Sequence, residues 1–263
     1  MDRRGSGDAQ AGSTAATDPA QSAAEPAAPT VASLMDAFFG ENVYRDFPLA
    51  DYEPDLQGWG GHDFLLKVID ELQPKTIVEV GVWKGRSAIA MAKRLKAQGS
   101  GGVVICIDTW LGAQEHFQEK FRGDLRRRNG YPHLYDQFIA NVLHEGVEDV
   151  VLPLPLASLA AAQLLARRKL VADMIHIDAG HGYLEVKSDI AAYWPLLSGD
   201  GVAIFDDYGG WQGVTRAVNE FAAKTALPLI GTHGKALLSP SRKVRFRTKL
   251  ATIDKGAWAP KGS

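Results

Sequence analysis

The chain has 263 residues, 46% of them hydrophobic, and a formal net charge of −2. This length can bury one sizeable core, and the near-neutral charge gives no electrostatic footprint for nucleic acid, although Arg126, Arg127 and Arg128 form a short basic run. The single cysteine, Cys106, excludes an intrachain disulfide, and no apolar run approaches the roughly 20 residues that cross a bilayer. We therefore expect a soluble, cytoplasmic protein that binds neither nucleic acid nor membranes.

Composition divides the chain into four segments. Residues 1–30 are rich in Ala, Ser, Gly and Pro and contain no apolar block, which predicts a disordered tail rather than a secretory signal. Residues 31–73 predict N-terminal helices around an irregular stretch, 47–61, that we interpret as a lid. Residues 74–254 predict the main α/β domain, and residues 255–263 a flexible end.

Helical periodicity and short apolar runs alternate along the chain. We predict helices at Val31–Phe39, His62–Leu72, Ser87–Lys96, Leu134–Leu143, Leu159–Arg167, Leu184–Leu196 and Val214–Ala223, and strands at Ile77–Val80, Val103–Ile107, Val150–Leu154, Met174–Ile177 and Val202–Phe205. Apolar strands without alternation are typical of a parallel sheet covered by helices on both faces, so the predicted class is α/β, doubly wound. Strand signals without helices at 229–231, 236–238 and 244–250 predict an antiparallel C-terminal edge.

The first predicted strand leads into a glycine turn. Its sequence, TIVEVGVWKGRSAIAMAKRL, ends the strand in an acid and places Gly81 and Gly85 four residues apart before a helix. Glycine lets the backbone turn and approach a ligand, and the amides that open a helix favour a polar group. The spacing differs from the GxGxxG of dinucleotide folds, which favours a nucleotide-like cofactor without phosphates. An ordinary βα connection remains the alternative for this turn taken alone.

Acids follow most of the predicted strands, and in open parallel sheets ligands bind beyond those strand ends. Glu79 ends the first strand and Asp108 the second, where a carboxylate can accept hydrogen bonds from ribose hydroxyls. The third strand leads to Ser158, which either caps the next helix or contacts an adenine ring. The sequence thus predicts a nucleoside ligand.

Three further acids predict a metal site. Asp178, Asp206 and Asp207 follow neighbouring strands, and their repulsion is costly unless a positive charge lies among them. Oxygen ligands without cysteine suit magnesium, calcium or manganese. The alternative is that Asp207 caps a turn and Asp206 forms a salt bridge. His181 lies on a predicted loop and is a candidate general base, whereas His176 lies inside a strand and is interpreted as a packed side chain.

The motifs VEVGVWKGRSA, ICIDTWLG and IHIDAGHGYLEVKSDIAAYWPLLSGDGVAIFDDY resemble those of class I S-adenosylmethionine-dependent methyltransferases. More narrowly, they are similar to the bacterial branch that includes cephalosporin hydroxylase-like and macrolide-sugar O-methyltransferase proteins. The resemblance runs from roughly Gln57 to Phe221. It implies a Rossmann-like, mostly parallel seven-stranded sheet with a reversed final strand, and it makes residues 74–254 the cofactor-binding catalytic domain.

The resemblance also implies positions for the cofactor. It places Glu79, Gly81 and Ser87 near the methionine moiety, with Gly85 in the same motif, Asp108 at the ribose, and Ala157 and Ser158 beside the adenine. Trp110 looks like a family feature near the cofactor, although packing would equally explain it.

Compared with the related catechol O-methyltransferases, Asp178, Asp206 and Asp207 fall where that group holds magnesium, and His181 falls where it has a catalytic lysine. Asp207 replaces an amide ligand, and the added negative charge should bind the ion more tightly but acidify its substrate less, so a catechol acceptor is disfavoured. The resemblance implies divalent-metal-assisted O-methylation of a hydroxyl on a small molecule or sugar. Asp178 would help to hold the metal and His181 would remove the proton.

Two other functions are weighed against this one. An NAD-dependent oxidoreductase on a related sheet is disfavoured by the missing GxGxxG and by the carboxylate cluster. A non-catalytic cofactor-binding scaffold that supports a hydroxylase is disfavoured by the presence of all three acids and His181. A homo-oligomer is compatible with the sequence.

Overall fold

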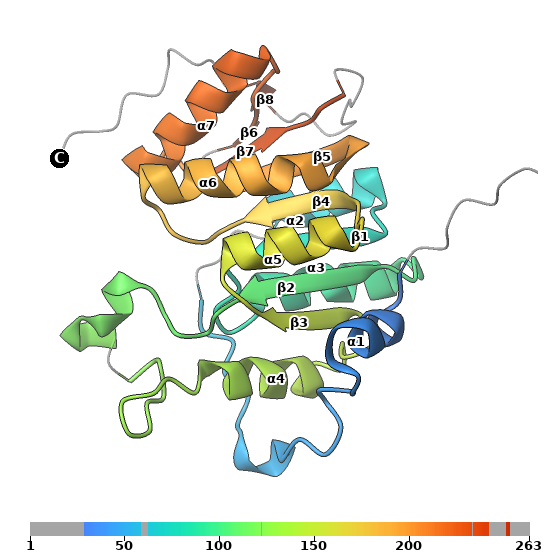
Figure 1. Cartoon of the computed structure of the whole chain (residues 1–263), viewed down its shortest axis with the longest axis vertical. Coiled ribbons are helices and arrows are strands. Elements are labelled where there is room, and N and C mark those ends of the chain that lie inside the picture. Colours follow the sequence, from blue (N-terminus) through green and yellow to red (C-terminus); the bar gives the residue numbers. More distant parts are fainter. Residues whose placement is uncertain (1–28, 59–62, 122, 233, 242–250, 253–263) are drawn as a thin grey trace, which may run out of the picture.

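The structure is a computed structural model that describes residues 29–58, 63–121, 123–232, 234–241 and 251–252 (Figure 1). Most of the predicted tail, the predicted strand at 244–250 and the predicted flexible end lie outside these ranges. Within the described ranges, no helix combines the length and the apolar character that crossing a membrane requires.

A single mixed sheet forms the centre of the molecule, with strand order β3-β2-β1-β4-β5-β7-β6-β8 in the described part of the chain. The strands are β1 Thr76–Val80, β2 Val103–Asp108, β3 Val151–Pro155, β4 Ala172–Ile177, β5 Leu197–Tyr208, β6 Ile230–Thr232, β7 Gly234–Leu238 and β8 Ala251–Thr252. Strands β1 to β5 pair in parallel, and β7 runs antiparallel to β5. The predicted mostly parallel seven-stranded sheet with an antiparallel edge is therefore confirmed, and β8 adds a two-residue pairing to β6.

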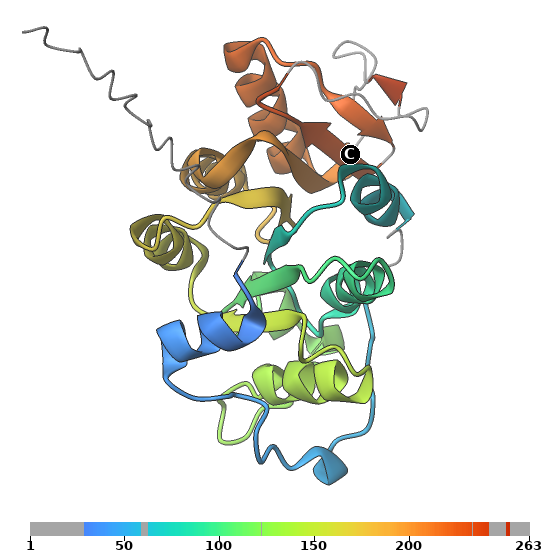
Figure 2. The same cartoon turned by 90° about the vertical axis from the view of Figure 1, so that its right-hand side faces the viewer.

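Helices cover both faces of this sheet. They are α1 Val31–Phe39, α2 Asp63–Leu72, α3 Arg86–Ala97, α4 Leu134–His144, α5 Ser158–Arg167, α6 Tyr183–Tyr193 and α7 Gln212–Thr225. Figure 2 shows α2 and α3 on one face and α5, α6 and α7 on the other, which is the doubly wound arrangement. Strand β1 is consequently buried along its whole length.

One predicted helix is shorter than expected. Its pattern extends to Leu196, but α6 ends at Tyr193 and a 3-10 turn, Trp194–Leu196, follows. Pro195 lies in this turn, and because proline has no backbone N–H it cannot continue the helical hydrogen-bond pattern.

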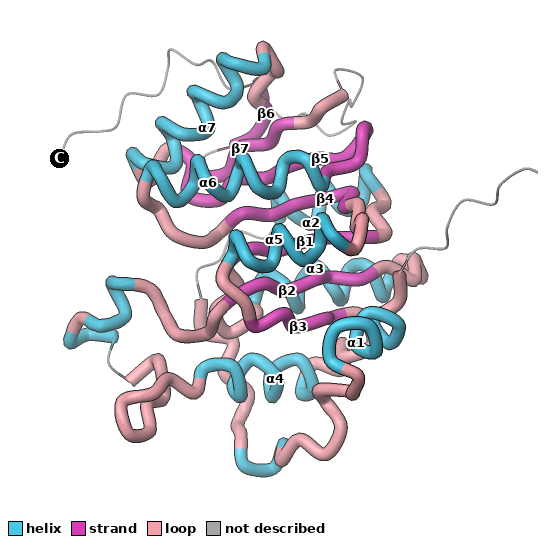
Figure 3. The backbone as a smooth tube through the Cα atoms, viewed as in Figure 1, coloured by secondary structure: helices cyan, strands magenta, loops and turns pink. Residues whose placement is uncertain are grey.

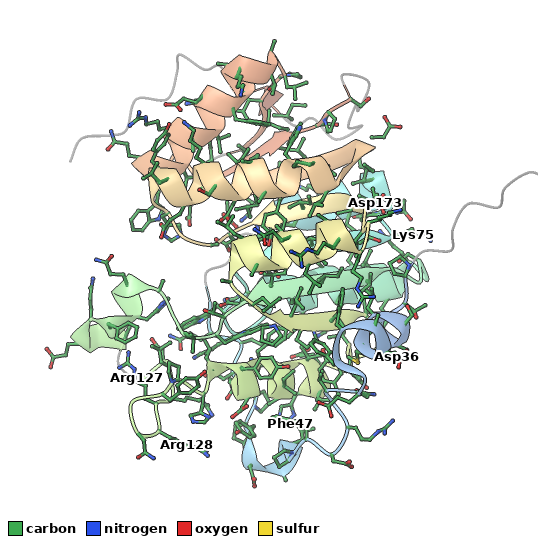
Figure 4. The ribbon with its side chains drawn as sticks, viewed as in Figure 1. Asp36, Phe47, Lys75, Arg127, Arg128 and Asp173 are labelled. Atoms are coloured by element: carbon green, nitrogen blue, oxygen red, sulfur yellow. The ribbon has the colours of Figure 1, made fainter. Side chains whose placement is uncertain are left out.

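The amino and carboxyl ends of the parallel strands carry different features. At the amino ends, Asp173 at the start of β4 accepts the backbone N–H groups of Lys75 and Thr76 at 2.8 and 3.0 Å, and this ties β4 to β1 (Figure 4). At the carboxyl ends of the strands, the described residues between β2 and α4, 109–121 and 123–133, project away from the sheet as loops with two short 3-10 helices, Gln114–Phe117 and Glu119–Phe121 (Figure 3). We call residues 109–133 the β2–α4 excursion, and Arg127 and Arg128 lie on it.

The chain leaves β1 through two glycines with left-handed backbone. Gly81 has φ +84°, and a Cβ there would overlap the backbone carbonyl of Asp178 at the tip of β4. Gly85 has φ +91°, and a Cβ there would lie 2.8 Å from the ring of Phe138. Glycine is thus required at these two positions because neighbouring segments pack too closely to leave room for a Cβ. The turn brings the tips of β1 and β4 into backbone contact.

We predict that Gly81→Ala lowers the free energy of unfolding more than Gly99→Ala does. Gly99 also has positive φ, +60°, but no atom lies within 4 Å of the position of a Cβ. The control therefore measures only the left-handed penalty, about 1–2 kcal/mol, whereas Gly81→Ala adds a clash with backbone. Urea unfolding of both variants gives the comparison, and equal losses would show that the β1–β4 contact is loose.

Candidate active site

Asp108, at the tip of β2, fixes the loop that follows β1. Its Oδ2 accepts the backbone N–H groups of Val82 and Trp83 at 2.8 and 3.0 Å, and its Oδ1 accepts that of Trp110 at 2.8 Å. Trp83 and Trp110 both have left-handed backbone, with φ of 56° and 51°. The carboxylate thus holds residues 82–83 in one conformation beside the strand tip where a ribose was predicted.

Trp110 supports this loop from the core. Its side chain is 1% exposed, its rings pack against Tyr135 and Phe138, and its indole Nε1 donates to the carbonyl of Trp83 at 2.8 Å. The packing explanation raised by the sequence is what the structure shows. Trp110 therefore shapes the loop through the backbone of Trp83.

Glu79 is a buried carboxylate with one free oxygen. Its Oε1 accepts the hydroxyl of Ser87 at 2.5 Å and faces Nδ1 of His176 at 3.0 Å. Its Oε2 is buried and has no hydrogen-bond partner among the described residues. Because an unpaired buried acceptor costs about 1–3 kcal/mol, this oxygen fits a site for a ligand donor.

His176 lies at the centre of a row of charged side chains. Its Nε2 lies 3.2 Å from Oδ2 of Asp206, and the ammonium of Lys235 on β7 contacts the same oxygen. We call Glu79, His176, Asp206 and Lys235 the charge ladder. The prediction that His176 is packed is correct for its burial, but the sequence interpretation missed its role as a link between two carboxylates.

The ladder alters the titration of its members. Burial opposes a charged imidazole, but the hydrogen bonds with Asp206 and Glu79 raise the pKa of His176 to about 10. Burial likewise opposes ionisation of Asp206, yet hydrogen bonds from His176 and Lys235 hold its pKa below its ordinary value. Both groups are therefore charged at neutral pH.

The predicted acids and His181 are divided between two overlapping clusters at the tips of β4 and β5. One donor atom each from Asp178, His181 and Asp207 lie within 4.8 Å of one another, as do donor atoms of His176, Asp178 and Asp206. Burial, together with the charge of Asp206, raises the pKa of Asp178 to about 7. The salt bridge of Asp206, the alternative raised by the sequence, is present, so His176 and Lys235 supply part of the positive charge that this cluster requires.

His181 is oriented from two sides. Its Nε2 lies 2.9 Å from Oδ2 of Asp207, and its ring stacks on Trp211 with centroids 4.4 Å apart and planes at 19°. Trp211 is 50% exposed. A small hollow lined by Asp178, His181, Asp206, Phe205 and Val214 lies beside this pair, and the imidazole borders it.

Ser158 has a different role from helix capping. The N-cap of α5 is Ala157, and Ser158 is the first helical residue. Its hydroxyl donates to Asp189 on α6, and its carbonyl accepts the hydroxyl of Tyr193 at 2.7 Å. The capping alternative is wrong, and the predicted adenine contact of Ala157 and Ser158 stays a prediction.

Part of the predicted lid is fastened to residues 81–85, the loop between β1 and α3, which we call the cofactor loop because the sequence predicts a cofactor there. Lys84 is buried, and its ammonium donates to Asp55 and Gln57 at 2.7 and 2.9 Å. Asn141 on α4 donates to the carbonyl of Asp55 at 2.7 Å and accepts its N–H at 2.9 Å. Residues 55–57 are thus anchored, while Trp59 to Gly61, the end of the predicted lid, lie outside the described residues.

The β2–α4 excursion contacts the same loop. The ring of His116 stacks on Trp83 with centroids 4.2 Å apart and planes at 17°. Arg127 donates to the carbonyl of His116 at 3.2 Å and places its guanidinium 4.4 Å from the ring of Phe117. Arg127, in the middle of the short basic run, is half-buried and holds the excursion together.

Known proteins with similar sequences and structures identify the family. Residues 78–208 match a family described as a methyltransferase domain. The chain is 23% identical over 159 residues to a Sinorhizobium fredii (strain NBRC 101917 / NGR234) protein called uncharacterized protein y4gI, and the match covers 57% of this chain but 16% of that longer relative.

Three solved structures share the fold. The O-methyltransferase NovP is 24% identical with a TM-score of 0.52, covering 69% of this chain and 78% of its own. An O-methyltransferase from Bacillus cereus in complex with SAH is 17% identical with a TM-score of 0.52, covering 78% and 94%. TomG from Streptomyces achromogenes, in complex with SAM and involved in tomaymycin synthesis, is 17% identical with a TM-score of 0.51, covering 72% and 83%.

The family match spans every predicted site residue from Glu79 to Asp207. The match rules against the alternative of an NAD-dependent oxidoreductase and confirms the family that the motifs resemble. The chain belongs to the class I S-adenosylmethionine-dependent methyltransferases.

Proposed function

We propose that this protein transfers a methyl group from S-adenosylmethionine to a hydroxyl oxygen of a small molecule or sugar, with the assistance of a divalent cation. The observation that carries the proposal is that the free buried oxygen of Glu79 and the Asp178–His181–Asp207 cluster lie at the tips of adjacent strands. The free oxygen of Glu79 can accept a hydrogen bond from the amino group of a cofactor, and the Asp178–His181–Asp207 cluster can take an acceptor hydroxyl. The name O-methyltransferase carried by the three similar structures agrees with this choice of acceptor atom.

The residues at the tips of β1 and β2 fit the cofactor. Glu79 Oε2 would accept a hydrogen bond from its amino group, and Ser87 holds the other oxygen of Glu79 in place. Asp108 would accept the ribose hydroxyls while it fixes the loop. Gly81, Gly85, Ala157 and Ser158 would border the cofactor through backbone. S-adenosylmethionine supplies a methyl group already activated by the sulfonium, so the protein has to provide alignment and a deprotonated acceptor.

The residues at the tips of β4 and β5 fit a divalent cation such as Mg²⁺. We propose that Asp178, Asp206 and Asp207 hold it, because carboxylate oxygens are the ligands that such hard cations prefer. A bound cation would lower the pKa of a coordinated hydroxyl. His181 would remove its proton, and Asp207 would stabilise the imidazolium that forms, since the two side chains are already 2.9 Å apart.

We predict that Asp108→Ala and Asp207→Ala separate cofactor binding from chemistry. Asp108→Ala removes three hydrogen bonds that order the cofactor loop and should weaken SAH binding at least about 10-fold, given a typical 1.5–3 kcal/mol for a bond to a charged group. Asp207→Ala should leave the Kd for SAH within about twofold but reduce turnover at least about 100-fold, the scale of lost general acid-base catalysis. Calorimetry with SAH and a methyl-donor consumption assay give the two readouts.

The matched control is Asp200→Ala, which removes an exposed carboxylate on β5 and should change neither readout. Equal losses of SAH affinity in Asp108→Ala and Asp207→Ala would contradict the assignment of separate roles.

Removal of divalent metal should abolish turnover. We predict that dialysis against EDTA stops methyl transfer to a panel of sugars and polyketides, and that Mg²⁺ restores it. Calorimetric titration of Mg²⁺ into the EDTA-treated protein should give a binding isotherm that Asp178→Ala eliminates, which tests the site independently of turnover. Full turnover in EDTA would refute the metal-assisted mechanism, and SAH binding without turnover on any acceptor would favour the scaffold alternative.

A further inference from the structure

We infer that the charge ladder is a positioning device that couples the cofactor side of the site to the acceptor side, and that Lys235 is the positioning residue at its far end. The inference rests on the proposed function, because it takes Glu79 as a cofactor contact and Asp206 as an acceptor-side ligand.

The four members come from four adjacent strands, β1, β4, β5 and β7. Glu79 pairs in register with His176, and Asp206 pairs in register with Lys235. His176 pairs with Ile204, two residues before Asp206, and residues two apart on a strand share a face. The sheet itself therefore lines up the four side chains in one row across its carboxyl edge.

The charges in this row alternate and are largely shielded from water. The side chains of Glu79 and His176 are 0% exposed, that of Asp206 is 17% exposed and that of Lys235 is 8% exposed. Buried charges persist when each has a partner, and removing one partner leaves its neighbour uncompensated. Loss of a charge at one end of the row therefore alters the interactions of the next member.

His176 is the member through which such a change passes. Each of its two ring nitrogens faces a carboxylate oxygen, at 3.0 Å for Glu79 and 3.2 Å for Asp206. The imidazole cannot move toward one carboxylate without lengthening its contact with the other. Asp206 in turn is held by Lys235 on its opposite side, so Lys235 limits how far Asp206 can draw His176 away from Glu79.

Lys235 is too distant to act on the cofactor by contact. It lies three strands from Glu79, or about 14 Å at the usual strand spacing of about 4.8 Å. Substitutions at sites this far apart without shared partners usually have additive effects. Loss of a positive charge acting only through space would slightly favour a ligand ammonium at Glu79, whereas loss of a ladder member would weaken ligand binding. The two explanations thus predict opposite changes in ligand affinity when Lys235 is replaced.

The test is a double-mutant cycle on the Kd for SAH, measured by calorimetry with the full chain. We expect Lys235→Met to weaken SAH binding at least about fivefold, the lower end of typical coupling between sites, and to have less than a twofold effect in a Glu79→Gln background. Lys235→Arg should restore affinity because it keeps the positive charge next to Asp206. Lys67→Met, which removes an exposed lysine on α2, should change nothing.

If Lys235 had a merely structural role, Lys235→Met would weaken SAH binding by the same factor in the wild-type and Glu79→Gln backgrounds. Equal factors would therefore overturn the inference that the charge ladder couples the two sides. So would an unchanged or tighter Kd for Lys235→Met. If Lys235→Met does not fold, Lys235→Gln replaces it in the same cycle, because glutamine keeps a donor and removes the charge. Failure of the wild-type chain to bind SAH would refute the proposed function instead, and the inference with it.

Discussion

The site depends on the contact between Glu79 on β1 and His176 on β4, which lie side by side in the middle of the sheet, 3.0 Å apart and without access to water. A carboxylate at this depth is stable because an imidazole and a hydroxyl face one of its oxygens. The same arrangement leaves the other oxygen without a partner among the described residues, and this oxygen is the one proposed to accept a hydrogen bond from the cofactor. Stability of the central pair and availability of the ligand site therefore have one physical origin.

The two halves of the site are fixed by different kinds of interaction. On the cofactor side, Asp108 holds backbone N–H groups, whose positions follow from the fold and do not depend on side-chain rotamers. On the acceptor side, Asp206, Asp207 and His181 are held mainly by contacts with other charged or aromatic side chains. Because charged side chains respond to a bound cation or hydroxyl more readily than backbone does, the proposed acceptor side is the half that would adjust when ligands bind.

Much of the fold could be predicted because it depends on local sequence patterns. Apolar runs that end in acids located β1, β2 and β4 within two residues, whereas β5 begins five residues before its predicted start; the parallel pairing of β4 with β5 then places the acids that follow them at one end of the sheet. The functions of His176 and Lys235 could not be predicted, since they depend on the reversal of β7 and on its register with β5, which no local sequence signal fixes. Two signals were nevertheless present: His176 shares the face of Asp178, and Lys235 is the only charged residue of β7. The capping alternative for Ser158 was wrong because the partner of its hydroxyl, Asp189, lies on another helix.

The cofactor loop also organises two segments that lie beside the candidate site. Lys84 binds residues 55–57, and Trp83 stacks on His116 of the β2–α4 excursion, so two insertions distant in sequence attach to adjacent residues of one loop. Asp108 holds the backbone of Trp83, which lies next to Lys84 in the chain. The conformation that this carboxylate imposes therefore sets where both insertions can lie. Under the proposed function, variation in these insertions would change the acceptor while the loop beside the cofactor stays the same.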